Sequence, residues 1–291
     1  MTATPTAEWA ATRELLNPRA IPTKTPALSA HVAHVLETES PLHAWTYHRR
    51  LGGKPKPPTS PMELGTIMHN LLLEGGNRVV ELPYDAYRSN EAKAEKAKVL
   101  ALDLLPVLSE KLVEAKTCVE RWRERLQSIR ILGEPFDFSG GVSEVPLEWT
   151  EDGVLCHGRP DWLRKDRALI VDWKTTEGNN APETCAAALL RSAGVIQDHA
   201  YRTAVEIEHP ELAGRVQCVF LFAQIVEPFA VTPITCAASM REIGSGRWRR
   251  ARETWERCLR TNTWPSYATS PVAVEAPAWA LHREMNQGEW I

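Results

Sequence analysis

The sequence predicts an α/β (α+β) fold, in which helices flank a central mixed β-sheet. Apolar residues at helical spacing dominate residues 28–130, and strand-like runs dominate residues 142–174. A helix, two more strands and a closing helix follow, an order typical of a mixed sheet. With 291 residues, of which 43% are hydrophobic, the chain is long enough to bury a large core. We expect a flexible arm over residues 1–27 and a single domain over residues 28–291, with an N-terminal helical part and a C-terminal helix and tail.

Helices are predicted throughout the first part of that domain. Ser29 opens a short helix that ends near residue 39, and Pro41 starts a second one that runs to residue 50. Pro61 begins a third helix, which two glycines end at residues 75–76. Residues 90–130 fit one or two long helices, and Pro106 is expected to kink or divide them.

Strands are predicted after the glycine pair at residues 140–141. Three runs are expected to pair as two hairpins, with turns at 151–153 and 164–167: residues 142–149, 154–163 and 168–174. Residues 181–207 are predicted to be helical, and two strands follow at 216–226 and 229–234. A basic amphipathic helix over residues 237–260 and a tail containing Pro and Trp close the chain.

Composition excludes several classes of protein. The net charge is −3, from 34 Lys and Arg against 37 Asp and Glu, which excludes a polybasic binder but not a local basic cleft. The longest apolar runs have about ten residues, well short of the ~20 that cross a bilayer, and the N-terminus carries no signal pattern. The six cysteines form no CxxC pair, which disfavours zinc or an iron–sulphur cluster. We therefore expect a protein of the reducing cytoplasm that has no membrane contact.

The most informative polar residues lie in the stretch GRPDWLRKDRALIVDWKTT, residues 158–176. If its strands pair across the turn at 164–167, Asp161 lies opposite Ile170, on the same face as Asp172 and Lys174. The two carboxylates would then be diagonal neighbours, with Cβ atoms roughly 7–8 Å apart. Two acids so placed require a cation between them, and oxygen ligands favour Mg²⁺ or Mn²⁺. One or two such ions, with Lys174 to orient a water or offset developing charge, are the equipment for phosphodiester hydrolysis.

A simpler explanation is a surface hairpin whose Asp and Lys side chains are solvated or paired with each other. The pattern Asp…Asp-x-Lys is common by chance. Against this explanation, the apolar run at 168–171 predicts a central strand, so the charges at its end belong to a sheet terminus, where sites often lie.

Four blocks of sequence, in order, resemble the PD-(D/E)xK nuclease superfamily and its RecB-like branch. The blocks are LGTIMHNLLLE with His69, GRPDWL with Asp161, VDWKTT with Asp172 and Lys174, and QDHAY with Gln197 and Tyr201. The set is most similar to the RecE-type exonuclease VIII domain of phage and prophage recombination systems. Many relatives carry Glu where this chain has Asp172, and Asp198 and His199 stand where small apolar residues are expected.

The resemblance implies a restriction-endonuclease-like core and a role for each matched residue. His69, Asp161, Asp172 and the backbone carbonyl of Trp173 would be metal ligands, and Glu144 a further candidate. Lys174 would be the catalytic lysine, with Asp161 and Asp172 also catalytic. Gln197 and Tyr201 would orient active-site groups or the DNA end. Without the resemblance, His69 is more simply a core histidine, and Gln197 and Tyr201 more simply cap a buried helix face.

Basic residues outside the motifs are candidates for contact with DNA phosphates. The closing helix carries seven Arg against three Glu between residues 241 and 260. The candidates are Arg88, Lys93, Lys96, Arg159, Arg247, Arg249 and Arg250. The alternative for the closing helix is that it packs Trp248 and Trp255 inward and solvates its arginines. We expect most of the eleven tryptophans to pack, with Trp162 and Trp173 on the buried face behind the acids, and Trp264 and Trp279 anchoring the tail.

The resemblance further implies a Mg²⁺-dependent exonuclease that acts 5′ to 3′ on double-stranded DNA ends and leaves 3′ single strands. Such enzymes are often homo-oligomeric rings, and a single-strand annealing protein would be a partner. Two alternatives remain open: a RecB-like nuclease of other polarity or an endonuclease, and a catalytically silent protein that binds DNA ends.

Overall fold

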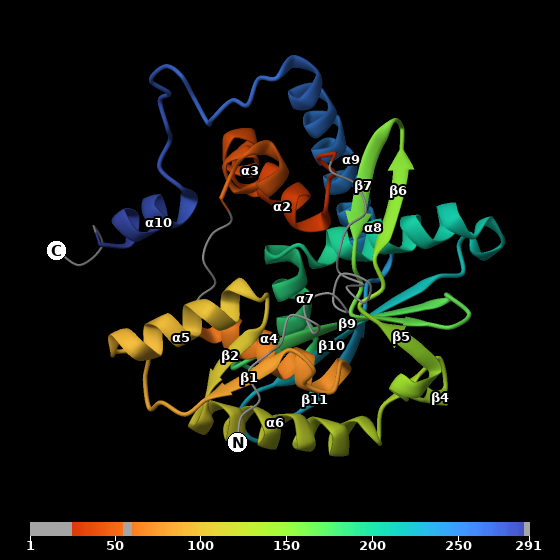
Figure 1. Ribbon diagram of the computed structural model, residues 1–291. Helices are drawn as coiled ribbons and strands as arrows, with labels where there is room; N and C mark the ends of the chain where they lie inside the picture. Colours follow the sequence, from red (N-terminus) through yellow and green to blue (C-terminus); the bar gives the residue numbers. More distant parts are fainter. Residues whose placement is uncertain (1–24, 55–59, 288–291) are drawn as a thin grey trace.

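The computed structural model describes residues 25–54 and 60–287 (Figure 1). Nearly all of the arm predicted over residues 1–27 lies outside the described residues. A five-stranded sheet in the order β11-β10-β9-β8-β5 forms the centre. Strands β9 and β10 are parallel, and the other neighbours are antiparallel. The predicted fold class, a mixed sheet flanked by helices, is therefore confirmed.

The strands of this sheet are short at one edge and long at the centre. Their bounds are Gly141–Ser143 for β5, Trp162–Arg164 for β8, Leu169–Thr176 for β9, Gln217–Gln224 for β10 and Val231–Thr235 for β11. A separate antiparallel hairpin joins β6 (Leu147–Glu151) to β7 (Val154–Gly158). A smaller one joins β3 (Arg130–Ile131) to β4 (Glu134–Pro135).

Several helices begin close to the predicted residues, whereas α10 lies in the stretch that was predicted as a tail. They are α2 (Ala30–Thr38), α3 (Pro41–Tyr47), α4 (Ser60–Leu73), α5 (Asn90–Ala101), α6 (Ser109–Leu126), α7 (Pro182–Arg191), α8 (Gly194–Glu208), α9 (Ala238–Thr261) and α10 (Ala278–Gln287). Short 3₁₀ turns occur at Arg49–Leu51, Phe138–Gly140 and Pro210–Leu212. Ser29 caps α2 by accepting a hydrogen bond from the backbone N–H of Val32, as the sequence predicts. No helix in the described part of the chain combines the length and apolarity that a bilayer crossing requires.

Alternation along β9 sorts its side chains between two cores. Ile170 packs with residues of α2, α8 and α9, whereas Val171 and Trp173 pack with residues of α4 and α6. In Figure 1, α8 lies on one side of the sheet and α6 on the other. Because Asp172 and Lys174 have the parity of Ile170, they face the α8 side. Trp162 and Trp173 are buried on the opposite side, as predicted.

Two predicted strands are each divided in the structure. The run at 142–149 breaks at Glu144, whose φ of 59° is incompatible with a continuous strand. The run at 154–163 breaks at residues 159–161, where Pro160 has no N–H to donate to a ladder. As a result, β5 and β8 belong to the central sheet, while β6 and β7 leave it as a separate hairpin.

The register of the β8–β9 hairpin also differs from the predicted one. Trp162 pairs with Val171 and Leu163 with Ile170, so Ile170 lies opposite Leu163 and not opposite Asp161, which precedes β8. The turn is longer than expected because Arg167 adopts a φ of 60° and the Asp166 carboxylate accepts a hydrogen bond from the N–H of Ala168. The shift by two residues keeps Trp162 on the same face as Val171 and Trp173.

The region predicted to be entirely helical, residues 90–130, contains a strand. β1 (Val79–Leu82) pairs in parallel with β2 (Leu105–Leu108) in a two-stranded sheet between α5 and α6. Pro106 lies in β2. Its missing N–H destabilises the sheet little, because each strand of a two-stranded sheet has a partner on one side only.

The predicted helix 181–207 is divided as well, into α7 and α8. Trp279, expected to anchor the tail, is 69% exposed.

At Gly244, α9 lies very close to α8. A Cβ atom at Gly244 would overlap the backbone carbonyl oxygen of Val195 at the start of α8.

We expect Gly244→Ala to lower the free energy of unfolding by about 1–3 kcal/mol, because the backbone must shift to make room for the added methyl group. Urea denaturation measures this change. Gly246→Ala on the same helix is the matched control, since its Cβ would meet only the end of the Arg250 side chain at 3.4 Å. It should be neutral or stabilising by up to ~1 kcal/mol, and equal losses in the two variants would contradict the packing argument.

Candidate active site and metal centre

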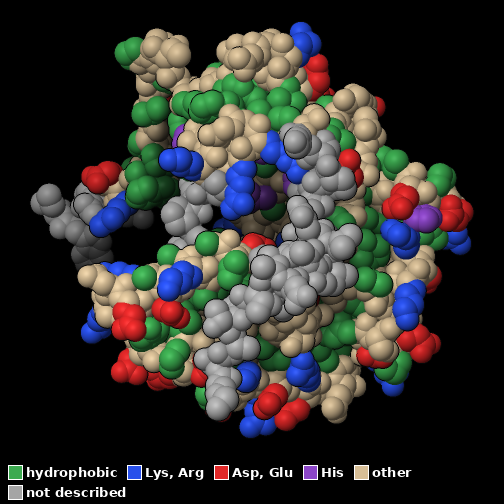
Figure 2. All heavy atoms as spheres, in the orientation of Figure 1, with side chains coloured by type: hydrophobic (Ala, Val, Ile, Leu, Met, Phe, Trp, Pro, Cys, Tyr) green, Lys and Arg blue, Asp and Glu red, His purple; other side chains and the backbone are tan. Residues whose placement is uncertain are grey.

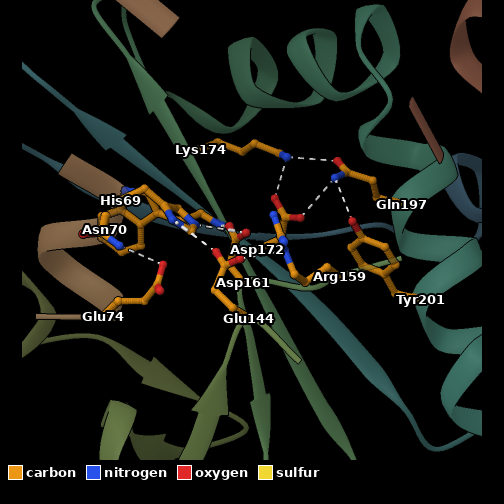
Figure 3. A network of polar contacts seen from close by, with 11 residues as sticks. His69, Asn70, Glu74, Glu144, Arg159, Asp161, Asp172, Lys174, Gln197 and Tyr201 are labelled. Carbon is orange, nitrogen blue, oxygen red and sulfur yellow. Dashed lines mark hydrogen bonds and ion pairs between the residues drawn. The ribbon is translucent and has the colours of Figure 1, made fainter. Parts of the chain in front are cut away.

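Strand β9 supplies an ion pair at the end of the sheet. Lys174 Nζ lies 2.5 Å from Asp172 Oδ1 and donates a hydrogen bond to Gln197 Oε1 at 2.9 Å (Figure 3). Asp172 is only 2% exposed. The ammonium group is therefore held between a buried carboxylate and an amide oxygen.

Helix α8 supplies the two polar residues of the fourth sequence block. Gln197 Nε2 donates to Asp172 Oδ2 and to the Tyr201 hydroxyl, each at 3.2 Å. Residues four apart lie on one face of a helix, which is why Gln197 and Tyr201 meet. Gly158 at the end of β7 makes room for the Tyr201 ring, since a Cβ there would lie 2.6 Å from Tyr201 Cε1. The structure thus brings Gln197 and Tyr201 together with the predicted catalytic pair.

Helix α4 brings His69 to the same end of the sheet. His69 Nε2 is 3.0 Å from Asp161 Oδ1, and Nδ1 is 3.4 Å from Glu144 Oε1. Gly65, one turn earlier, allows the approach, because a Cβ there would lie 3.2 Å from Thr175 Oγ1 of β9. The glycine of the predicted G-x-x-x-H pattern therefore has a steric reason in this fold.

The two breaks in the predicted strands place Glu144 and Asp161 side by side. The N–H of Glu144 donates to the carbonyl oxygen of Asp161 at 3.0 Å. Asp161 Oδ2 accepts a hydrogen bond from the N–H of Trp173 at 2.5 Å. Glu144 Oε2 is 2.6 Å from Arg159 Nε, in the segment between β7 and β8. Glu144 is 4% exposed, so this carboxylate is buried among charged partners.

Three of these side chains could hold a divalent cation. One ligand atom each from His69, Glu144 and Asp161 lies within 4.8 Å of the others. Two carboxylates and an imidazole fit Mg²⁺ or Mn²⁺, which prefer oxygen ligands, and exclude a soft thiolate site. Glu144, a further candidate in the sequence, is central to this group. The Asp172 carboxylate contacts Lys174 and Gln197 and is not among these three grouped ligands. Metal binding by Asp172 and by the Trp173 carbonyl therefore stays a prediction.

The pKa values of the site show how its charges compensate one another. Burial, helped by the charge of Asp161, raises the pKa of Asp172 to about 6 against the opposing pull of Lys174. Burial lowers the pKa of Lys174, but Asp172 and Asp161 outweigh it, so the net direction is upward and Lys174 stays an ammonium at neutral pH. The pKa of His69 is likewise raised, because Asp161 and Glu144 overcome the burial that would lower it. Without a metal, cationic side chains therefore neutralise the acids.

The site opens into a pocket of about 650 Å³. Its lining combines residues of α4, of the two places where the predicted strands break (Glu144 and residues 159–161), and of the end of β9. The lining residues are Met62, Gly65, Thr66, His69, Glu144, Arg159, Asp161, Trp173, Lys174 and Thr175. Figure 2 shows a hollow on the face drawn in Figure 1, with Lys and Arg side chains at its rim and His and acidic side chains inside.

The predicted DNA contacts are distributed over several places. Arg159 is at the site itself and lines the pocket. Lys96 of α5 forms an ion pair with Glu63 of α4 at 3.0 Å, close to pocket-lining Met62 in sequence. Arg88 and Lys93 are exposed on and just before α5. Their roles in DNA binding remain predictions.

The arginines of α9 are mostly engaged with protein. Arg247 donates to the carbonyl oxygen of Leu190 at 2.7 Å, Arg249 is 3.8 Å from Glu253, and Arg250 pairs with Glu37 of α2. Trp248 and Trp255 are fully buried on the other side of this helix. The contacts match the packing alternative for the closing helix, and DNA contact by these three arginines stays a prediction.

Two structural supports of the site were not identified from the sequence. Gly158 matters for the space it leaves beside Tyr201. Asn70, 1% exposed, follows His69 and ties the end of α4 to the next turn, because its amide donates to Glu74 and Asn77 and its oxygen accepts from the N–H of Arg78. In the sequence, Asn70 could have been recognised as a polar residue among the apolar positions of α4.

Asp198 is one of the two residues that depart from the expected pattern of the fourth sequence block. It is fully buried and pairs with Arg202 at 2.9 Å, so it belongs to the core.

The sequence and the fold resemble those of known proteins. A family model described as the PD-(D/E)XK nuclease superfamily matches residues 27–275. A crystal structure from Eubacterium rectale, described as a "putative exonuclease", is similar with a TM-score of 0.55 and 11% identity, covering 97% of this chain and 98% of that chain. At this identity the likeness shows the fold alone. The structure of SSO0001 gives a TM-score of 0.27 at 10% identity, covering 73% of this chain and 99% of that one, which is too low to indicate a shared fold. No curated protein matches the sequence.

The grouping of His69, Glu144 and Asp161 predicts metal binding that depends on the Asp161 carboxylate. Asp161→Asn should weaken Mn²⁺ binding at least about tenfold in titration calorimetry, because it removes an anionic ligand from the group with His69 and Glu144. Asp85→Asn is the control, since this exposed carboxylate has no place in the site. Normal Mn²⁺ affinity in Asp161→Asn would contradict the assignment.

Proposed function

Because the chain belongs to the PD-(D/E)XK nuclease superfamily, we propose that it is a Mg²⁺-dependent DNA exonuclease that digests duplex ends 5′ to 3′ and leaves 3′ single strands for strand annealing. The observation that carries the hydrolytic part is the meeting, at one pocket, of the Lys174–Asp172 pair with the His69–Glu144–Asp161 group. The similarity of the four sequence blocks to RecE-type exonucleases supports the polarity and the product. The same similarity supports a homo-oligomeric ring and an annealing protein as partner in the cytoplasm of a bacterial host.

His69, Glu144 and Asp161 would hold the metal, and Asp172 and the Trp173 carbonyl are additional candidates. A divalent cation supplies Lewis acidity and a more acidic bound water. Lys174 keeps its proton at Nζ, since its pKa is raised. It therefore acts as a cation that orients a water or offsets charge on the phosphate, and not as a base.

The remaining residues hold Lys174 in place. Asp172 and Gln197 each contact its ammonium group, and Tyr201 contacts the Gln197 amide from the next turn of α8. Burial of this network keeps it in a low-dielectric setting, in which a fixed positive charge acts more strongly on a phosphate. A catalytically silent end-binding protein is the weaker alternative, because such a protein has no need of this complete arrangement.

Lys174→Ala should abolish cleavage of a linear duplex while leaving DNA binding unchanged. Loss of the fixed cation should slow the reaction at least about a hundredfold, as removal of one stabilising donor does in other hydrolases. Single-turnover cleavage and a gel-shift titration measure the two properties. Lys116→Ala, on the exposed surface of α6, is the matched control. Unchanged cleavage by Lys174→Ala would refute the site.

Digestion of end-labelled duplex DNA with Mg²⁺ tests the direction of cleavage. The 5′ label should appear early in short products, while the 3′ label stays on fragments that shorten progressively. Omission of the metal should stop both changes. Early release of the 3′ label would indicate opposite polarity, and nicking of closed circular plasmid would indicate an endonuclease.

A further inference from the structure

An aromatic ring lies beside the ammonium group of Lys174. Nζ of Lys174 is over the ring of Phe220, 5.7 Å from the ring centroid. Phe220 belongs to β10 and is in parallel register with Asp172 of β9, so its side chain stands on the same face of the sheet as the Asp172–Lys174 pair. The ring therefore approaches the ammonium group from the neighbouring strand.

Burial of the ring favours a strong attraction between the two groups. Phe220 is 0% exposed and packs in the core that includes residues of α8 and α9. The face of an aromatic ring carries partial negative charge, which attracts a cation within about 6 Å of the centroid, and the attraction is greater where water is excluded. Ile would suit a buried strand position equally well, but it has no such charge.

The ring differs in kind from the other two partners of Lys174. Asp172 and Gln197 hold the ammonium group through oxygen atoms (Figure 3). Asp172 is also a candidate metal ligand, so a bound cation would compete with Lys174 for its carboxylate. The ring is neutral and fully buried, so its hold on the ammonium group does not depend on which charges enter the pocket.

We propose that Phe220 is a positioning residue for cleavage: the face of its ring holds the Lys174 ammonium group where it acts on the phosphate. The inference rests on the proposed nuclease function, in which Lys174 supplies a fixed cation. Phe220 is neither in the metal group nor among the described residues that line the pocket, so it acts through Lys174 alone.

Fluorinated phenylalanines at position 220 test the contact with little change in the shape of the core. Each ring fluorine withdraws negative charge from the ring face and hardly alters the ring volume. With one, two and three fluorines, the logarithm of the single-turnover rate on linear duplex should fall in equal steps, by about three- to thirtyfold in all.

The same series at Phe222 is the matched control. Phe222 lies on the same face of β10 and is 6% exposed, and in the described part of the chain no cation lies over its ring. Its fluorinated variants should cleave like the unmodified protein. Equal rates throughout the Phe220 series, or the same decline in both series, would overturn the proposal.

The mobility of Lys174 tests the contact without any need for catalysis. In protein without DNA, with or without Mg²⁺, ¹³C relaxation of the Lys174 ε-carbon should give a lower order parameter with each fluorine at position 220, and no change with fluorine at position 222. A constant order parameter across the Phe220 series would overturn the proposal. If the unmodified protein cleaves no DNA, the proposed function fails, and the order parameter alone decides whether Phe220 holds Lys174.

Discussion

The backbone hydrogen bond between Glu144 and Asp161 joins the two points at which the chain leaves the central sheet. On one side of these points, β5 and β8 pair within the sheet, and on the other, β6 and β7 pair with each other. A continuous strand at either place would direct its carboxylate by strand alternation alone. The paired breaks instead bring Glu144, Arg159 and Asp161 to one place, opposite His69. The metal group and the pocket beside it both follow from this arrangement.

The cost of burying acids explains much of the rest. Glu144 and Asp172 are almost fully buried, and each has a cationic side chain within 2.6 Å. Carboxylates in such surroundings are tolerated only with positive charge beside them. The side chains that now supply that charge, His69, Lys174 and Arg159, are the same ones that a metal or a phosphate would engage. The site is therefore balanced in charge before any ligand arrives, and a ligand exchanges one set of partners for another.

Local pattern was sufficient to predict part of this. The alternation in β9 placed Asp172 and Lys174 on one face and Trp173 on the other, and helical spacing paired Gln197 with Tyr201. What failed depended on backbone conformation or distant contacts. The left-handed conformation of Glu144 and Arg167 has no signal in residue type, so one strand was predicted too long and one register was predicted wrongly. The break of the other strand at Pro160 did carry a signal, because proline has no N–H for a ladder. The pairing of β1 with β2 joins segments more than twenty residues apart, and only the folded chain shows that the arginines of α9 are matched by protein partners.

The site draws on widely separated stretches of chain, from Gly65 and His69 in α4 to Gln197 and Tyr201 in α8. During synthesis, the metal group could close once β8 and β9 have formed, but Lys174 would lack its amide partner until α8 emerges. Between these two moments the chain would have acidic residues able to gather a cation and an ammonium group not yet held in place. A chain that ends before α8 would therefore contain the His69–Glu144–Asp161 group but lack the amide that holds Lys174 and Asp172.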